Sequence, residues 1–392
     1  MGYYFAVHPS NAPSSEAVSW SSEEWYNDVN AEAVDVEAVG EKSFWGAVQV
    51  RTALTLKPAE FKRKYMHAGV PVVIRDDPGA MALAHGLTLD KILSMCGDLS
   101  PELGNRIVSV LQNLPPPIFD AVSERLWATD GLSLESVITE LKGEGNTKTL
   151  NDFFNGPLFS AVQTAQDPRF PSAKKDWTHP ADYLWPPSIH SWRIAQCKPL
   201  KKFVADILDR GASGTGGISY LRALIEDDGP DLTAEPKEIY DTFLFASGDK
   251  CRAYHPHIHG RPNHTILLVL KGSKRVVTWP ASERDKLYPF MSGQLGRNDI
   301  GERNEIFMVD AFNVNTTLQP DLKDVSGGLM GQARKGDLLY IPCGLVHTLE
   351  NVGDMVAIGW LPTDETDKGI TKPRLKHCPN ANAYKYVDGD HS

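Results

Sequence analysis

One stretch decides how this chain is interpreted: Tyr254-His255-Pro256-His257-Ile258-His259. In a β-strand, residues i and i+2 point to the same face, so His257 and His259 can both enter a barrel interior if the strand stays extended there. A third imidazole, His347, follows the segment Gly336-Asp337-Leu338-Leu339-Tyr340-Ile341-Pro342. A strand, a Pro/Gly turn and a return strand would bring it opposite the first pair. The spacing therefore predicts a metal site carried by strands.

Three imidazole ligands would leave coordination positions open, which suits a catalytic metal better than a structural one. Each histidine has a plainer interpretation when taken alone. Histidines in loops are often surface residues, and a single buried histidine is usually a hydrogen-bonded core residue. The three histidines together, set among predicted strands, favour the metal site over these alternatives.

The second half of the chain has the pattern of a β protein. Short runs rich in aliphatic and aromatic residues are separated by Gly, Asp, Pro and Asn turns. We expect strands at residues 240–246, 251–257, 265–270, 274–278, 337–341, 347–351 and 355–361. Many short strands with frequent turns predict a sandwich or a barrel. Residues 289–334 interrupt them as an irregular polar insert, of the kind that commonly shapes a substrate mouth.

The first half of the chain predicts mainly helices. A proline in its first turn marks a short helix at Lys57–Tyr65, and Val70–Arg75 predicts a buried strand. Apolar residues at helical spacing predict further helices at 87–96, 132–141, 150–159 and 200–208. The glycine-rich segment 211–217 lacks the lysine of a phosphate-binding loop and predicts a plain mobile loop. We therefore divide the chain into a leader (1–45), a mixed helical and strand region packing on the barrel (46–230), the barrel (231–365) and a tail (366–392).

Composition narrows the class of protein. The 392 residues carry a net charge of −10, which argues against a mainly electrostatic grip on nucleic acid or anionic lipid. No window approaches the roughly eighteen apolar residues of a membrane span. The five cysteines are spread along the chain without a CxxC pair, which predicts reduced thiols and an intracellular, cytoplasmic location, with the nucleus and organelles left open.

From residue 240 to residue 362 the chain resembles the Jumonji C (JmjC) group of 2-oxoglutarate-dependent oxygenases, in its hydroxylase branch. The matching segments are the histidine strand, Gly272–Pro280 with Leu287-Tyr288-Pro289 after it, Gly336–Pro342 leading to His347, and Phe61 with Val70–Arg75 near the start. The resemblance implies a mainly β fold with flanking helices. Its core would be a double-stranded β-helix, the cupin or jelly-roll barrel, with a helical N-terminal region.

The resemblance leaves three registers for the metal motif, which is His-x-Asp in the family. Placing His257-Ile258-His259 there keeps the distance to Lys274 found in the arginyl- and lysyl-hydroxylase branch. Placing His259-Gly260-Arg261 there would put a cation where a ligand belongs, and His255-Pro256-His257 fits the downstream spacing less well. We favour the first register, with His257, His259 and His347 as ligands, so that His259 replaces the family's aspartate.

The same resemblance implies how a cosubstrate would bind. Lys274 takes the position of the lysine that pairs with the distal carboxylate of 2-oxoglutarate, and Tyr254 takes that of a hydroxyl donor beside it. Asn351 could add a hydrogen bond. Without the resemblance, Lys274 would be interpreted as an exposed residue of a hairpin turn. Iron(II) is the expected metal, with other divalent transition metals open, and no catalytic residue is expected beyond the metal ligands.

Three functions follow. The first is hydroxylation, or a related oxidation, of a small molecule or a peptide side chain, dependent on Fe(II) and 2-oxoglutarate. The second is a three-histidine cupin oxygenase that does not use 2-oxoglutarate, because the missing aspartate raises the charge of the site by one unit. The third is a non-catalytic metal-binding or regulatory JmjC-like protein. Neither a nucleic acid nor a membrane is expected as a binding partner.

Overall fold

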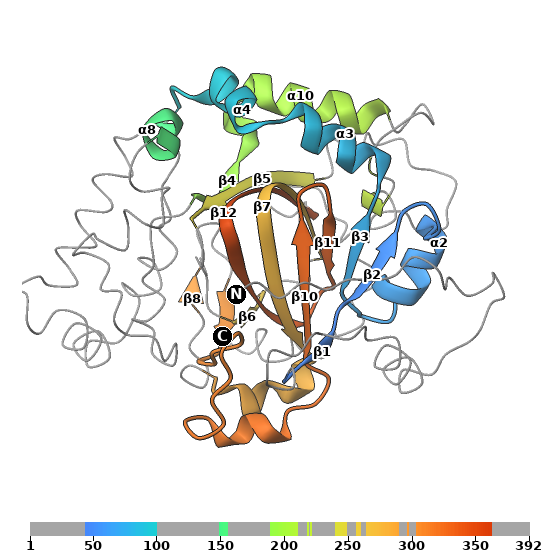
Figure 1. Ribbon diagram of the computed structural model, residues 1–392, viewed down its shortest axis with the longest axis vertical. Coiled ribbons are helices and arrows are strands. Elements are labelled where there is room, and N and C mark those ends of the chain that lie inside the picture. The colour runs from blue at the N-terminus through green and yellow to red at the C-terminus, as the bar shows by residue number, and fades with distance from the viewer. Residues whose placement is uncertain are drawn as a thin grey trace, which may run out of the picture.

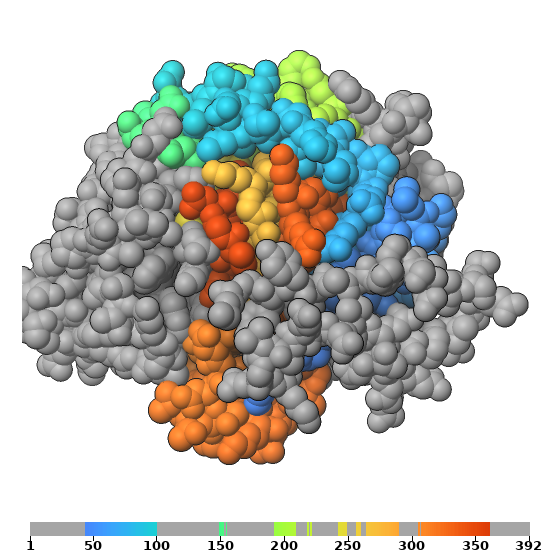
Figure 2. Space-filling view, viewed as in Figure 1, coloured from blue at the N-terminus to red at the C-terminus, as the bar shows by residue number. Residues whose placement is uncertain are grey.

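The computed structural model describes residues 44–99, 149–155, 189–210, 218, 220–221, 240–248, 256–259, 264–289, 296–297 and 303–362. Within these ranges the protein is mainly β, with one large mixed sheet and a few helices, as expected. Helices α3 (Pro78–Gly86), α4 (Leu89–Cys96) and α10 (Lys198–Arg210) form a layer above the strands (Figures 1 and 2). No helix in the described ranges combines the length and the apolar character needed to cross a membrane.

Two long antiparallel strands organise the sheet: β7 (Thr265–Trp279) and β12 (Val346–Pro362). Toward one end, β7 pairs with β11 (Leu338–Ile341) and β12 pairs with β5 (Tyr240–Ser247). Toward the other end, β7 pairs with β10 (Leu329–Arg334) and β12 pairs with β6 (His257–Ile258). Each long strand therefore belongs to both halves of the sheet.

The N-terminal segment joins the two halves a second time. Strand β1 (Gly46–Ala47) runs parallel to β10, and β2 (Gln49–Thr52) runs parallel to β3 (Val72–Arg75), which in turn pairs with β11. The remaining elements lie at the margins: α2 (Pro58–Phe61), η1 (Lys62–Met66), α8 (Leu150–Asn155), β4 (Ile189–Arg193), η3 (Ile194–Gln196), η4 (Ala281–Leu287), β8 (Gly296–Arg297), β9 (Arg303–Ile306) and η5 (Pro320–Asp324).

The predicted strands 265–270 and 274–278 form one strand, and so do 347–351 and 355–361. The prediction of separate strands was therefore wrong for both pairs. Gly272 and Gly353 adopt φ values of +70° and +75°, so the chain bends there without ending the strand. The register between β7 and β12 shifts close to these glycines. Strand β10 lies inside the segment 289–334, which was predicted to be irregular. The prediction missed this strand because its sequence, Leu-Met-Gly-Gln-Ala-Arg, lacks the β-branched and aromatic residues that indicate a strand.

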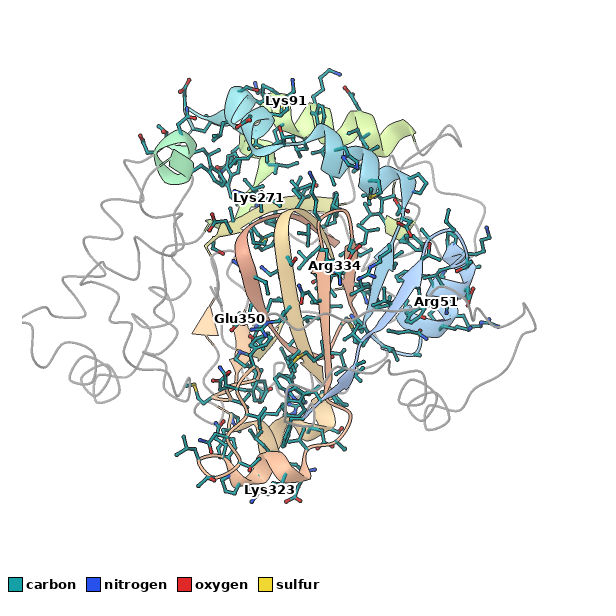
Figure 3. All side chains as sticks on the ribbon, in the orientation of Figure 1. Arg51, Lys91, Lys271, Lys323, Arg334 and Glu350 are labelled. Atoms are coloured by element: carbon teal, nitrogen blue, oxygen red, sulfur yellow. A yellow bond between two sulfur atoms is a disulfide. The ribbon has the colours of Figure 1, made fainter. Side chains whose placement is uncertain are left out.

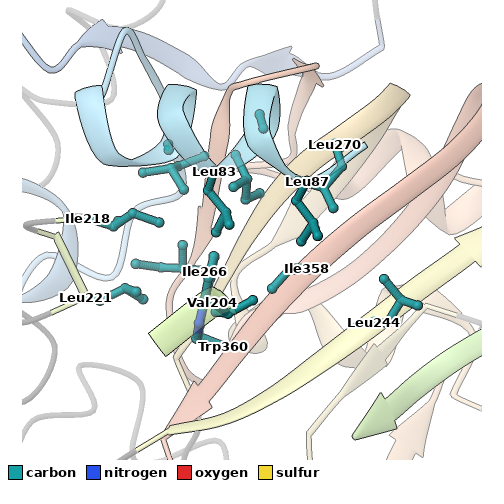
Figure 4. Close-up of a cluster of buried hydrophobic side chains, with 14 of the residues drawn as sticks. Leu83, Leu87, Val204, Ile218, Leu221, Leu244, Ile266, Leu270, Ile358 and Trp360 are labelled. Carbon is teal, nitrogen blue, oxygen red and sulfur yellow. The ribbon is translucent and has the colours of Figure 1, made fainter. Parts of the chain in front are cut away.

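Alternating side chains give the sheet two buried faces. On β11, Leu338 and Tyr340 pack toward the helices, while Leu339 and Ile341 face the other way. The outer cluster joins the helices to the strands through residues that include Leu83, Leu87, Val204, Ile266, Ile358 and Trp360 (Figure 4). The opposite cluster combines side chains from both halves of the sheet, including Val73, Phe245, Leu267, Val276, Leu329 and Ala333. The two halves therefore face each other across a shared apolar interior.

A disulfide ties the helical layer together. It joins Cys96, the last residue of α4, to Cys197, which directly precedes α10. The prediction of reduced thiols is wrong for this pair and for Cys343, which is also disulfide-bonded, so these cysteines do not support an intracellular location. The two residues are 101 positions apart, so their spacing in the sequence gave no sign that the fold places their Cα atoms 5.9 Å apart.

Several individual elements were predicted correctly. They include the short helical segment that begins at Pro58, the buried strand β3, and the helices α4 and α10. The predicted helix 132–141 and the glycine-rich loop 211–217 lie outside the described residues.

Candidate metal centre

The fold brings together the three histidines that the sequence singled out. His257 in β6 lies directly opposite His347 in β12, and His259 follows two residues after His257. One nitrogen of each ring can be chosen so that all three atoms lie within 4.8 Å of one another. The ring centroids are 4.4–5.0 Å apart. These three residues could therefore hold a metal ion.

The spacing of the nitrogens fits a shared metal. The Nε2 atoms of His259 and His347 are 3.2 Å apart. Two nitrogens at about 2.1 Å from one metal are roughly 3.0 Å apart at a right angle and roughly 3.4 Å apart in a tetrahedron. The observed distance lies between these values, so the pair needs little movement to become two adjacent ligands.

A backbone carbonyl fixes the protonation of His347. The Nδ1 atom lies 3.1 Å from the carbonyl oxygen of Leu345, which can only accept a hydrogen bond. The proton is therefore on Nδ1, and Nε2 carries the lone pair toward His259. This arrangement is the usual way in which a protein holds an imidazole ready to bind a metal. A metal ion shared by the two rings would also need the lone pair of His259 Nε2, so that nitrogen would have to be unprotonated on binding.

The three histidines differ in how deeply they are buried. His257 and His347 are each 4% exposed, whereas His259 is only partly buried. His259 is therefore the most solvent-exposed of the three. Such a site is shielded enough to strengthen polar interactions and still has one accessible side.

The two cosubstrate residues that the structure describes, Lys274 and Asn351, share the face of the histidines. They lie opposite each other on β7 and β12, four residues along from the pair formed by Thr278 and His347. Even spacing puts all four side chains on one face, with about 13 Å of strand between the two pairs. Lys274 is 7% exposed, and its Nζ atom lies 6.0 Å from the centroid of the Phe245 ring. The structure therefore makes Lys274 a buried residue of the interior, not an exposed hairpin residue.

Asn351 offers this interior an acceptor. Its Nδ2 donates to the hydroxyl of Ser247 at 2.6 Å and to the carbonyl of Gly248 at 3.0 Å. The Gly248 carbonyl can only accept a hydrogen bond, so the side-chain amide of Asn351 cannot be flipped to place Oδ1 there. Its Oδ1 is buried without a hydrogen-bond partner in the described part of the chain. Asn351 therefore suits contact with an ammonium group or a water better than direct contact with a carboxylate.

No carboxylate joins the histidine cluster within the described ranges. The acidic residue Glu350, labelled in Figure 3, is adjacent to Asn351 in the chain. It points to the opposite face, where it forms an ion pair with Arg275, its neighbour on β7. The Arg275 guanidinium also lies 5.1 Å from the centre of the Phe312 ring. In the described part of the chain, the candidate site thus consists of imidazoles alone.

The predicted hydroxyl donor Tyr254 and the alternative ligand His255 lie outside the described residues. A further polar group, which the sequence did not single out, lies close to the site: His264, fully buried at the start of β7. A lone histidine before an apolar strand carries no sequence signal, and only the fold places it against the turn that precedes His347.

No protein-family model matches the chain, and no curated protein matches it.

Proposed function

We propose that this protein is a metal-dependent oxygenase of the JmjC class. It would use Fe(II), or another divalent transition metal, and 2-oxoglutarate to hydroxylate or otherwise oxidise a small molecule or a peptide side chain. The observation that carries the proposal is the convergence of His257, His259 and His347 on the face that also holds Lys274. Two sheet halves that face each other and share their long strands support a double-stranded β-helix as the core.

Each residue has a defined task in this proposal. The three histidines would hold the metal, with the Nδ1 proton of His347 anchored on Leu345. A bound iron ion with 2-oxoglutarate would supply dioxygen activation for C–H oxidation, giving succinate and carbon dioxide. Lys274 would pair with the distal carboxylate, which would offset the cost of burying its charge. Asn351 would orient the Lys274 ammonium through Oδ1, and the apolar interior would exclude water.

A second candidate is a three-histidine oxygenase that acts without 2-oxoglutarate. The observation that favours it is the absence of a carboxylate from the histidine cluster in the described ranges. With three neutral imidazoles, the net charge of the metal and its ligands would be one unit higher than with two imidazoles and an aspartate. This difference alters the redox potential and the choice of metal. In this candidate Lys274 has no cosubstrate to bind.

Binding and turnover of 2-oxoglutarate separate these candidates. The full chain is loaded with Fe(II), and the dissociation constant of 2-oxoglutarate and the yield of succinate are measured for wild type, Lys274→Ala and Lys271→Ala. Lys271 is an exposed lysine on the same strand and serves as the control. We expect Lys274→Ala to raise the dissociation constant about 10- to 100-fold, the value of a charged hydrogen bond, and Lys271→Ala to leave it unchanged.

Other results have equally clear meanings. Metal-loaded wild type that neither binds nor consumes 2-oxoglutarate would rule out the first candidate. Full oxygenase activity in Lys274→Ala would favour the second. Tight metal binding with no turnover on any substrate tested would indicate a non-catalytic metal-binding protein.

The proposed substrate and location follow from charge and from the disulfide. The net charge of −10 supports a small molecule or peptide over nucleic acid. The Cys96–Cys197 disulfide supports an oxidising compartment over the cytoplasm, because cytosolic thiols are kept reduced.

A further inference from the structure

The His264 ring receives two hydrogen bonds at a single nitrogen. The backbone N–H of Cys343 donates to Nδ1 at 3.2 Å, and the Tyr340 hydroxyl lies 2.8 Å from the same atom. A backbone amide can only donate, so Nδ1 must carry a lone pair and the ring proton must be on Nε2. The Tyr340 hydroxyl then also donates. Burial raises the pKa of Tyr340 well above its ordinary value, so the hydroxyl keeps the proton that it donates.

The Cys343 amide belongs to the turn that carries the chain from β11 into β12. Gly344, the next residue, has φ +81°, which places it in the left-handed region that a tight turn of this kind requires. Leu345 follows, and its carbonyl holds Nδ1 of His347. One continuous path therefore runs from the His264 ring through the turn to the ring of His347.

His264 also belongs to the other side of the site by chain position. It lies five residues after His259 and directly before β7. Its hydrogen bond to Cys343 therefore ties the segment that carries His257 and His259 to the segment that carries His347.

We infer that His264 is a positioning residue of the metal centre: by accepting from Cys343 it fixes the turn whose Leu345 carbonyl aims His347. This inference rests on the proposed metal site. Outer hydrogen-bond partners of this kind commonly change metal affinity about 10- to 100-fold when removed.

The test compares two polar replacements that differ in where they place an acceptor. His264→Asn puts an oxygen close to the position of Nδ1, whereas His264→Gln puts it close to that of Nε2. The dissociation constant of Co(II) alone, and the visible spectrum of the Co(II) complex, are measured for both variants and for wild type. We expect Asn to retain an affinity close to wild type, and Gln to weaken binding about 10- to 100-fold with an altered spectrum.

Tyr340→Phe provides the matched control. It removes the other hydrogen bond to the same Nδ1 atom, at a site that is equally buried, and leaves the bond to Cys343 in place. Unfolding by urea without metal should show a loss of stability in both His264→Gln and Tyr340→Phe. Only His264→Gln should lose metal affinity, because only that variant removes the acceptor of the Cys343 N–H in the turn before His347.

Four outcomes would overturn the inference. Equal Co(II) affinities for the Asn and Gln variants would show that the acceptor position is irrelevant. A loss of affinity in Tyr340→Phe as large as that in His264→Gln would reduce His264 to a contributor to general stability. Wild type that binds no metal would overturn both this inference and the proposed metal centre, whereas wild type that binds metal with an unaffected Gln variant would overturn this inference alone.

Discussion

At the scale of single residues, the candidate site combines an ordered set of ligands with an unusual choice of one of them. The hydrogen bond from His347 to Leu345 sets its tautomer, and the 3.2 Å spacing to His259 suits two ligands on one metal. The third position of the expected motif is an imidazole instead of a carboxylate. In the proposed metal site, the identity of residue 259 would therefore control which metals are preferred.

Restoring the carboxylate with His259→Asp should shift this preference. Two histidines and one carboxylate form the triad typical of non-haem Fe(II) enzymes, while an all-imidazole site suits copper and zinc well. We expect the ratio of the Mn(II) and Cu(II) dissociation constants to move toward Mn(II) in this variant. His259→Ala is the control and should weaken binding of both metals. An unchanged ratio in His259→Asp would mean that residue 259 does not bind the metal.

The sequence was sufficient to select the three histidines that the fold brings together, because the alternation of side chains along a strand follows from the residue order. The roles of Asn351 and His264 were not accessible in the same way. Asn351 was expected to bind a cosubstrate, yet its amide nitrogen donates hydrogen bonds to Ser247 and Gly248, which are more than 100 residues away in the chain. Hydrogen-bond partners that are distant in sequence depend on the finished fold.

At the scale of elements, the continuity of β7 depends on one glycine. A Cβ atom at Gly272 would lie 2.4 Å from the carbonyl oxygen of Asp354 on β12, and the residue has φ +70°. Gly353, at the corresponding bend of β12, has φ +75° but no atom within 4 Å of such a Cβ. These two positions allow backbone strain to be separated from a steric clash.

Alanine at either glycine should destabilise the protein, and Gly272→Ala should do so more. Left-handed backbone costs a non-glycine residue about 1–2 kcal/mol, which is the whole effect expected for Gly353→Ala. Gly272→Ala adds a clash with backbone that cannot move without parting β7 from β12. Urea unfolding gives both free energies. Equal losses in the two variants would show that the bend relaxes around the added methyl group.

The cap of helix α3 predicts a pH dependence. Asp77 accepts a hydrogen bond from the backbone N–H of Ala80, and burial raises its pKa to about 6. As the pH rises, the carboxyl group of Asp77 loses its proton near pH 3.8 in the unfolded chain but only near pH 6 in the folded chain. The contribution of Asp77 to stability is therefore fully present below pH 3.8 and is lost as the pH rises through about 6.

Asp77→Asn keeps an acceptor at the cap but removes this titration. Between pH 4 and pH 7 the stability of wild type should fall relative to that of the variant by on the order of 2–3 kcal/mol. Urea unfolding of both proteins across this range measures the difference directly. Parallel pH profiles for the two proteins would contradict the prediction.

At the scale of the whole molecule, the helical layer is held to the sheet by the outer apolar cluster and within itself by the Cys96–Cys197 disulfide. The bond closes a loop of about one hundred residues. Cross-linking so long a loop restricts the unfolded chain and typically contributes about 2–5 kcal/mol to stability. The disulfide therefore counts among the larger single contributions to this fold.

Replacing both cysteines, as Cys96→Ala with Cys197→Ala, should lower the free energy of unfolding by about 2–5 kcal/mol under non-reducing conditions. Each single variant would leave an unpaired thiol, so the double variant is the appropriate comparison. Its Co(II) affinity should match that of wild type, because the bond lies in the helical layer and the histidines lie on strands. A double variant as stable as wild type would show that the two helices are held by packing alone.

The sequence predicted the class of fold better than its connections. Periodicity identified α10 and β5 because each pattern is local. It missed the pairing of β1 with β10, which joins segments almost 300 residues apart. It also split β7 at Gly272, because a glycine weakens a strand interior and its bend is not visible in the sequence. Pairings between distant segments are fixed by the packing of the interior, which no local pattern records.

The continuity of β7 and β12 has one last consequence. His347 and Asn351 lie on β12, and Thr278 and Lys274 lie opposite them on β7. The number of residues along these strands therefore sets the distance from the imidazole of His347 to the ammonium group of Lys274. Side chains alternate between faces, and this span can change only in two-residue steps of about 7 Å. Under the proposed function, a variant suited to a longer or shorter diacid would have to move its lysine by a whole two-residue step or use a cation from another strand.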